Sequence, residues 1–90
     1  MKIARHPEGF GFIEFLDDRL VITGGDPQII PREAVRSALC RDGKKSIFSR
    51  DPPAVFEIEY SVGVGTNRIK MLLPKDQKDA ASAALKDWGF

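Results

Sequence analysis

The stretch GFGFIEFLDDRLVIT, residues 9–23, decides how the fold begins. Two segments rich in aliphatic and aromatic residues flank LDD, whose aspartates are good turn formers, so the stretch predicts a β-hairpin. Side chains alternate between the two faces of a strand. A hairpin that pairs Phe15 with Leu20 therefore also pairs Ile13 with Ile22, and these four side chains form one apolar face that we expect in the core.

The opposite face of this hairpin is expected to meet water. It carries Phe10, Phe12, Glu14, Val21 and Thr23. The glutamate indicates a partly solvated surface, and two phenylalanine rings on such a surface are candidate binding residues. The alternative is structural: a helix covers both rings, which then form one layer of a two-sided sheet.

A second hairpin is predicted by VFEIEY and NRIKMLL, where apolar and polar residues alternate. One register fits both strands: Phe56 opposite Met71, Glu57 opposite Lys70, Ile58 opposite Ile69, and Glu59 opposite Arg68. One face is then apolar, and the other carries two cross-strand ion pairs. This register gives Arg68 and Lys70 a structural role rather than a ligand-binding one.

The segment between the hairpins, IIPREAVRSALCRDGK, predicts a helix. Pro31 suits a first helical turn, and Gly43 suits the end of a helix. Four apolar residues fall on one side at helical spacing: Ala34, Val35, Ala38 and Leu39. The alternative for the short AVRSAL is a strand. The following SIFSRDPPA reads as a loop or a short edge strand.

The last element is expected to be a helix from about residue 76 to residue 88. Its buried stripe is Ala81, Ala84, Leu85 and Trp88, and Gly89 ends it. Together these elements predict a single α+β domain spanning residues 1–90. It is a small antiparallel sheet or half-open barrel built from two β-hairpins, with a helix between them and a C-terminal helix.

Composition fits an ordinary globular domain, with 42% hydrophobic and 30% charged residues and a formal net charge of +1. The charge gathers in residues 32–50, where six basic residues stand against two acidic ones, a net +4. This segment is either a solvated face or a region that attracts anions.

The motif FGFI at residues 10–13, followed by RLVIT at residues 19–23, resembles the paired ribonucleoprotein motifs of cold-shock domains, which are small five-stranded OB-type barrels. KIARHPE is similar to a shortened first strand of that family, and VFEIEY with NRIKML to its closing pair. The resemblance implies that Phe10 and Phe12 stack single-stranded bases. The sequence departs from the family at Glu8, where a lysine is usual, and at Val21 and Thr23, where an aromatic residue and a histidine are usual.

A second resemblance concerns the order of elements. Hairpins first, a helix last, and Ile30-Pro31 before the third element are similar to bacterial pleckstrin-homology-like modules. This resemblance gives a fold alternative and no site residues.

Catalytic and metal-binding patterns are not visible in the sequence. His6 is the single histidine and has no cluster of cysteine or carboxylate ligands near it in sequence, so we predict no metal site and no cofactor. No nucleophile, base and orienting group stand at motif spacing, which argues against an enzyme. The lone Cys40 excludes an internal disulfide and indicates a reducing, cytoplasmic compartment. No segment approaches the apolar length of a membrane span, and none resembles a signal peptide.

Two functions follow as hypotheses. In the first, the chain is a non-enzymatic module that binds single-stranded RNA or DNA. Its site residues are Phe10 and Phe12, which stack bases, His6, which adds a ring at the edge, and Arg41, Lys44 and Lys45, which attract phosphates. In the alternative, the same apolar surface docks a protein partner or a second copy of the chain. Exposed rings close to the basic residues favour nucleic acid, and exposed rings away from them favour a protein.

Overall fold

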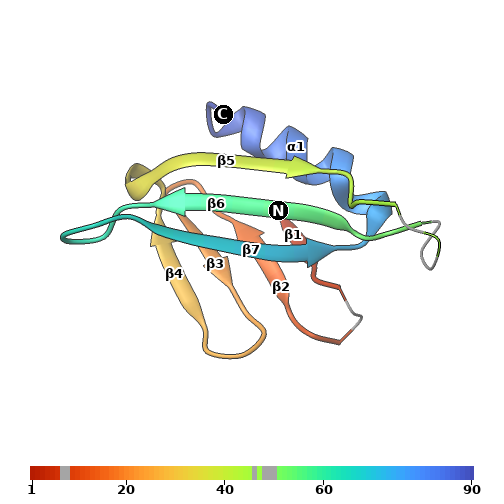
Figure 1. The fold of residues 1–90 in the computed structure, drawn as a ribbon. Coiled ribbons are helices and arrows are strands. Elements are labelled where there is room, and N and C mark those ends of the chain that lie inside the picture. Colours follow the sequence, from red (N-terminus) through yellow and green to blue (C-terminus); the bar gives the residue numbers. More distant parts are fainter. Residues whose placement is uncertain (7–8, 46, 48–50) are drawn as a thin grey trace.

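The computed structural model describes residues 1–6, 9–45, 47 and 51–90, and its strands form two antiparallel sheets (Figure 1). The first sheet has the order β1-β2-β3-β4, with β1 Lys2–Ala4, β2 Phe12–Phe15, β3 Arg19–Ile22 and β4 Gln28–Pro31. The second has the order β5-β6-β7, with β5 Val35–Arg41, β6 Ala54–Tyr60 and β7 Asn67–Leu73. A 3-10 turn η1 (Arg32–Ala34) connects the sheets, and η2 (Lys75–Gln77) leads into helix α1 (Lys78–Asp87).

The core lies between the two sheets and is closed by α1. It contains Ile3, Ile13, Phe15, Leu20, Ile22, Ile30, Val35, Ala54, Phe56, Ile58, Met71, Leu73, Ala81, Ala84, Leu85 and Trp88. In Figure 1, α1 lies along β5, and the strands of the four-stranded sheet cross those of the three-stranded sheet. The architecture is a small α+β domain of two sheets rather than a closed barrel.

The first predicted hairpin has the expected register. Phe15 pairs with Leu20 and Ile13 pairs with Ile22, and all four side chains are buried. The sequence prediction did not include β4, which adds Ile30 to the core beside Leu20.

The second predicted hairpin also has the expected register, from Phe56 opposite Met71 to Glu59 opposite Arg68. Its outer face carries both predicted ion pairs, Arg68–Glu59 at 3.0 Å and Lys70–Glu57 at 3.9 Å. These contacts lie at the surface, so each contributes at most about 1 kcal/mol.

The predicted helix between the hairpins is wrong, because the segment forms β4, η1 and β5 instead. The reason is a β-bulge between Val35 and Ser37, which shifts the register of β5 against β6. Val35, Ala38 and Cys40 therefore turn towards the core. These three inward side chains stand three and then two residues apart, so they break the regular alternation of a strand. Their spacing resembles that of the buried side of a helix.

The C-terminal helix is confirmed, and a 3-10 turn precedes it. Its predicted stripe is buried. Gly89 ends it with a φ of 97°, where the N–H of Gly89 donates to Lys86 O and the N–H of Phe90 donates to Leu85 O, both at 3.0 Å. This is the hydrogen-bond pattern of a Schellman motif.

Two sequence expectations fall partly or wholly outside the described residues. Glu8 is one of them, and most of SIFSR at residues 46–50 is the other. Asp51 to Pro53 have no regular structure, and β6 begins at Ala54. Across the ranges that the structure covers, no helix has the length and apolar character needed to cross a membrane.

Candidate binding surface

The two candidate phenylalanines lie on the outer face of the four-stranded sheet. Phe12 is half-buried, whereas its neighbour Ile13 points the other way into the core. Phe10, just before β2, is 46% exposed. Helix α1 lies along β5 (Figure 1), and its buried side chains belong to the core between the sheets. It therefore does not cover the two rings, as the structural alternative would require.

Each of these rings already contacts a cation of its own chain. The ammonium of Lys2 lies 4.0 Å from the centre of the Phe12 ring, and the guanidinium of Arg5 lies 4.7 Å from the centre of the Phe10 ring. Neither cation was predicted from the sequence. Pairing of β1 with β2, with Ala4 opposite Phe12, places them there, and that pairing is a long-range contact that the motif does not reveal. We call Lys2, Arg5, Phe10 and Phe12 the aromatic face.

Arg5 also fixes the end of this face. Its Nη1 donates to the backbone carbonyls of Thr23, at 2.7 Å, and Gly24, at 3.1 Å. Burial lowers the pKa of Arg5 from its ordinary value. Gly24 makes the close approach possible, since a Cβ on it would overlap the carbonyl oxygen of Phe10 and lie 2.9 Å from Arg5 Nη1. The rings are therefore held by a defined local structure.

The cations that the sequence predicted for this site lie elsewhere. Arg41 points outward from the three-stranded sheet, on the side away from the core, and pairs with Glu57 at 3.4 Å. Phe12 points outward from the other sheet, so the core separates the two. Lys44 and Lys45 are exposed in the segment after β5. His6 is exposed, and its backbone N–H donates to Leu72 O of β7 at 2.9 Å.

The outer face that carries Phe12 also carries Glu14 and two further apolar side chains. In register, Glu14 of β2 lies opposite Val21 of β3, and Val21 lies opposite Ile29 of β4. Val21 is half-buried and Ile29 is 65% exposed. The outer face therefore runs from the aromatic face to the edge strand β4.

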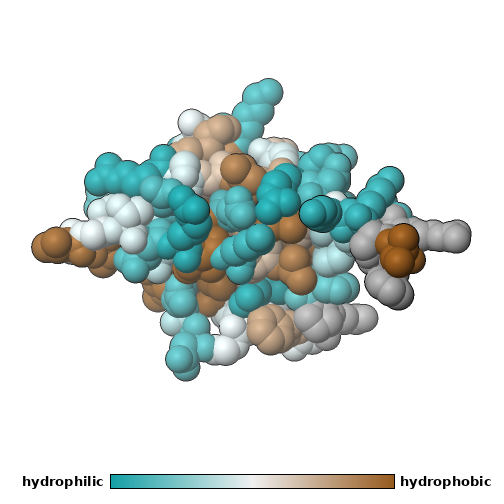
Figure 2. Space-filling view, in the orientation of Figure 1, coloured by the Kyte–Doolittle hydropathy of each residue, from teal (hydrophilic) through white to brown (hydrophobic). Residues whose placement is uncertain are grey.

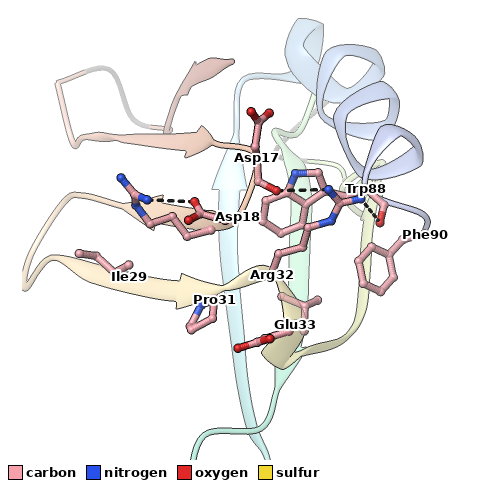
Figure 3. A pocket seen from close by; sticks show the side chains of 10 residues that line it. Asp17, Asp18, Ile29, Pro31, Arg32, Glu33, Trp88 and Phe90 are labelled. Carbon is pink, nitrogen blue, oxygen red and sulfur yellow. Dashed lines mark hydrogen bonds and ion pairs between the residues drawn. The ribbon is translucent and has the colours of Figure 1, made fainter.

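Beyond β4 the surface is hollowed into an open groove of about 760 Å³, which we call the C-terminal groove (Figure 3). It is lined by Asp17, Asp18, Arg19, Ile29, Pro31, Arg32, Glu33, Val35, Trp88 and Phe90. Three separate parts of the chain build it: the β2–β3 turn, β4 with its connection to β5, and the end of the helix.

Trp88 forms one wall of the C-terminal groove, and several contacts hold its side chain in place. Its ring packs edge-on against Phe15, with ring centres 5.5 Å apart, and its indole N–H donates to Leu16 O at 3.1 Å. The guanidinium of Arg32 lies 5.5 Å from the centre of the same ring. Through Nη1 and Nη2, Arg32 donates to the backbone carbonyls of Asp17, Asp87 and Trp88, at 3.2, 3.4 and 3.0 Å. Arg32 thus joins the end of α1 to the first sheet.

The carboxylates of the groove differ in their pairing. Asp18 forms an ion pair with Arg19 at 2.9 Å. Asp17 and Glu33 are exposed, and no ion pair joins either to any residue that the structure describes. In Figure 3 their carboxylates lie on either side of the Arg32 guanidinium.

The chemistry of the remaining candidates is limited. Cys40 is half-buried on β5, and burial, the largest influence, raises the pKa of its thiol, so the thiolate is scarce near neutral pH. Over residues 1–6, 9–45, 47 and 51–90, no group of three histidine, cysteine or carboxylate side chains is placed to hold a metal ion.

No protein-family model, curated protein or solved structure significantly matches this chain.

Proposed function

We propose that the chain is a non-enzymatic interaction module that binds a protein partner through the outer face of its four-stranded sheet. The observation that carries the proposal is the set of apolar side chains on this outer face: Phe12 and, beyond Glu14, Val21 and Ile29, the last of which lines the C-terminal groove. Protein interfaces combine aromatic and aliphatic anchors with arginine and a polar rim. The aromatic face and the groove supply these residue types on one side of the domain.

Electrostatics favour a protein over a nucleic acid at this surface. Arg41 pairs with Glu57 on the opposite sheet. Arg5 donates to two backbone carbonyls, and Lys2 shares the strand pairing of Glu14. The aromatic face carries Lys2 and Arg5 beside Glu14, a small net positive charge for a phosphate backbone, whereas the exposed apolar area gains by excluding water.

The order of elements supports a pleckstrin-homology-like arrangement over a five-stranded barrel. Four antiparallel strands, three antiparallel strands and a closing C-terminal helix follow each other along the chain. The second sequence resemblance rests on hairpins first and a helix last, and the pleckstrin-homology-like arrangement accompanies the protein-binding proposal.

Single-strand nucleic-acid binding is the second candidate function. It is supported by Phe10, whose ring is 46% exposed beside Arg5, and by Lys2 above Phe12. A base stacked on the open side of Phe10 places its phosphate near these cations. On this alternative, Phe10→Ala combined with Phe12→Ala abolishes salt-dependent binding of short single strands and leaves the domain folded.

The experiment that tests the protein proposal is selection from a random peptide library displayed on phage, with the folded domain as bait. We expect enriched peptides that bind the wild type, lose binding to Ile29→Glu, and keep binding to Leu39→Glu. Leu39 is the matched control because it is 46% exposed on the outer face of the other sheet.

Three results count against the protein proposal. One is a library that yields no enriched peptide, and another is equal loss of binding in the two variants. The third is tight binding of short single-stranded RNA that Phe10→Ala abolishes, which transfers the function to the second candidate. Sedimentation equilibrium of the domain alone tells whether the partner is a second copy.

A further inference from the structure

The C-terminal groove has the chemistry of a site for one kind of peptide. We propose that it binds an extended segment in which a lysine or arginine alternates with apolar side chains. The proposal rests on the protein-binding function above and names the partner chemistry at one end of the same surface.

The floor of the groove suits apolar side chains. Ile29 is 65% exposed and Phe90 is 43% exposed, and both line the groove together with Pro31 and Trp88. Figure 3 shows Ile29 and Pro31 along β4, with Trp88 and Phe90 at the end of the helix. Trp88 is held rigidly by its hydrogen bond to Leu16 O and its contact with Phe15. A rigid aromatic wall costs a ligand little ordering free energy.

The charged residues of the groove determine whether it favours an anionic or a cationic ligand. Arg32 is its best-placed cation, but both terminal nitrogens of this guanidinium donate to backbone carbonyls. Three of its five N–H groups are thereby used, so an arriving anion would find only two. Asp17 and Glu33 are exposed carboxylates outside any ion pair with the described residues, so an arriving cation finds two acceptors without displacing a partner. Cation–carboxylate attraction therefore favours a basic peptide.

Trp88 supplies a direct readout, because it is the single tryptophan of the chain and it lines the groove. The probes are three synthetic peptides of equal length, with leucine alternating with lysine, with serine or with glutamate. We expect the lysine peptide to shift Trp88 emission saturably, the serine peptide to bind more weakly, and the glutamate peptide to produce no saturable shift. Added salt should weaken the binding of the lysine peptide.

Variants test the carboxylates. Asp17→Asn and Glu33→Gln should each raise the dissociation constant of the lysine peptide about two- to fivefold, the range expected for exposed ion pairs. Asp79→Asn is the matched control, since Asp79 is an exposed carboxylate in the first turn of α1, at the end of the helix opposite Trp88. It should leave the dissociation constant unchanged.

The outcomes separate this inference from the broader function. Equal binding of the lysine and glutamate peptides, or equal effects of Asp79→Asn and Glu33→Gln, overturns the inference. Display-selected peptides that bind through Ile29 but leave Trp88 emission unaltered also overturn it, while the protein-binding function stands. If the library yields no ligand but the lysine peptide binds with the expected variant pattern, the groove proposal holds and the wider sheet face loses its role.

Discussion

The aromatic face depends on Gly24, and replacing this glycine by alanine is the sharpest test of its geometry. Gly24 has a φ of 100°, and a Cβ there would overlap the carbonyl oxygen of Phe10 and crowd Arg5 Nη1. Gly25 provides the matched control. It has a φ of 84°, but a Cβ on it would meet nothing within 4 Å.

The size of the effect follows from separating two costs. An alanine with a left-handed backbone costs about 1–2 kcal/mol at either position. Overlap with a backbone carbonyl and the Arg5 guanidinium adds about 1–3 kcal/mol at Gly24 alone, by analogy with overpacking. For a domain of this size, each kcal/mol corresponds to about 4–8 °C in Tm. Gly24→Ala should therefore melt at least about 4 °C below Gly25→Ala.

The assay is urea and thermal unfolding, followed by far-ultraviolet circular dichroism and by Trp88 fluorescence. Both probes should report one transition in each variant. Equal destabilisation of Gly24→Ala and Gly25→Ala would refute the close approach of Gly24, Phe10 and Arg5. Greater destabilisation of Gly25→Ala would refute the loop conformation itself.

Three further predictions concern single side chains. Trp88→Phe should cost about 1 kcal/mol through the lost hydrogen bond to Leu16 O, and Trp88→Ala about 3–5 kcal/mol, both measured by urea unfolding. Glu57→Gln should cost less than about 1 kcal/mol in the same assay, since its ion pairs lie at the surface, and a larger loss would contradict that placement. Cys40 should react with iodoacetamide more slowly in the folded than in the urea-unfolded chain at about pH 8.5, the ordinary thiol pKa, because burial raises its pKa. The unfolded chain releases this proton first, so Cys40 should also lower stability as the pH rises above that value.

The parts of the fold that could be predicted from the sequence are those in which apolar and polar residues alternate regularly along a strand. VFEIEY and NRIKMLL can satisfy their apolar and charged residues in a single register, and the structure has that register. The C-terminal helix was predictable because its apolar stripe and its closing glycine agree.

The middle of the chain was not predictable by the same means. The β-bulge after Val35 places Ala38 and Cys40 inward, so the apolar spacing of β5 resembles that of a helix. A bulge is fixed by the pairing with β6, which a local window of sequence does not contain. Pro31, which suits a helix start, instead ends the edge strand β4, a position that tolerates proline.

The aromatic rings of the candidate site could be predicted from the sequence, but the cations that contact them could not. Alternation along one hairpin placed Phe12 on the outer face. The partners of the two rings, Lys2 and Arg5, depend on the pairing of β1 with β2. The C-terminal groove combines three segments that lie far apart in the sequence, so no sequence motif indicates it. Figure 2 shows hydrophobic and hydrophilic residues mixed over the visible face, which illustrates why composition alone does not mark an interface.

Chemical-shift mapping of the ¹⁵N-labelled domain with a display-selected peptide tests the central claim most directly. We expect the shifted amides to cluster on β2, β3 and β4 and along the C-terminal groove, around Ile29, Arg32 and Trp88. Shifts that cluster instead around Arg41, Lys44 and Lys45 would contradict it.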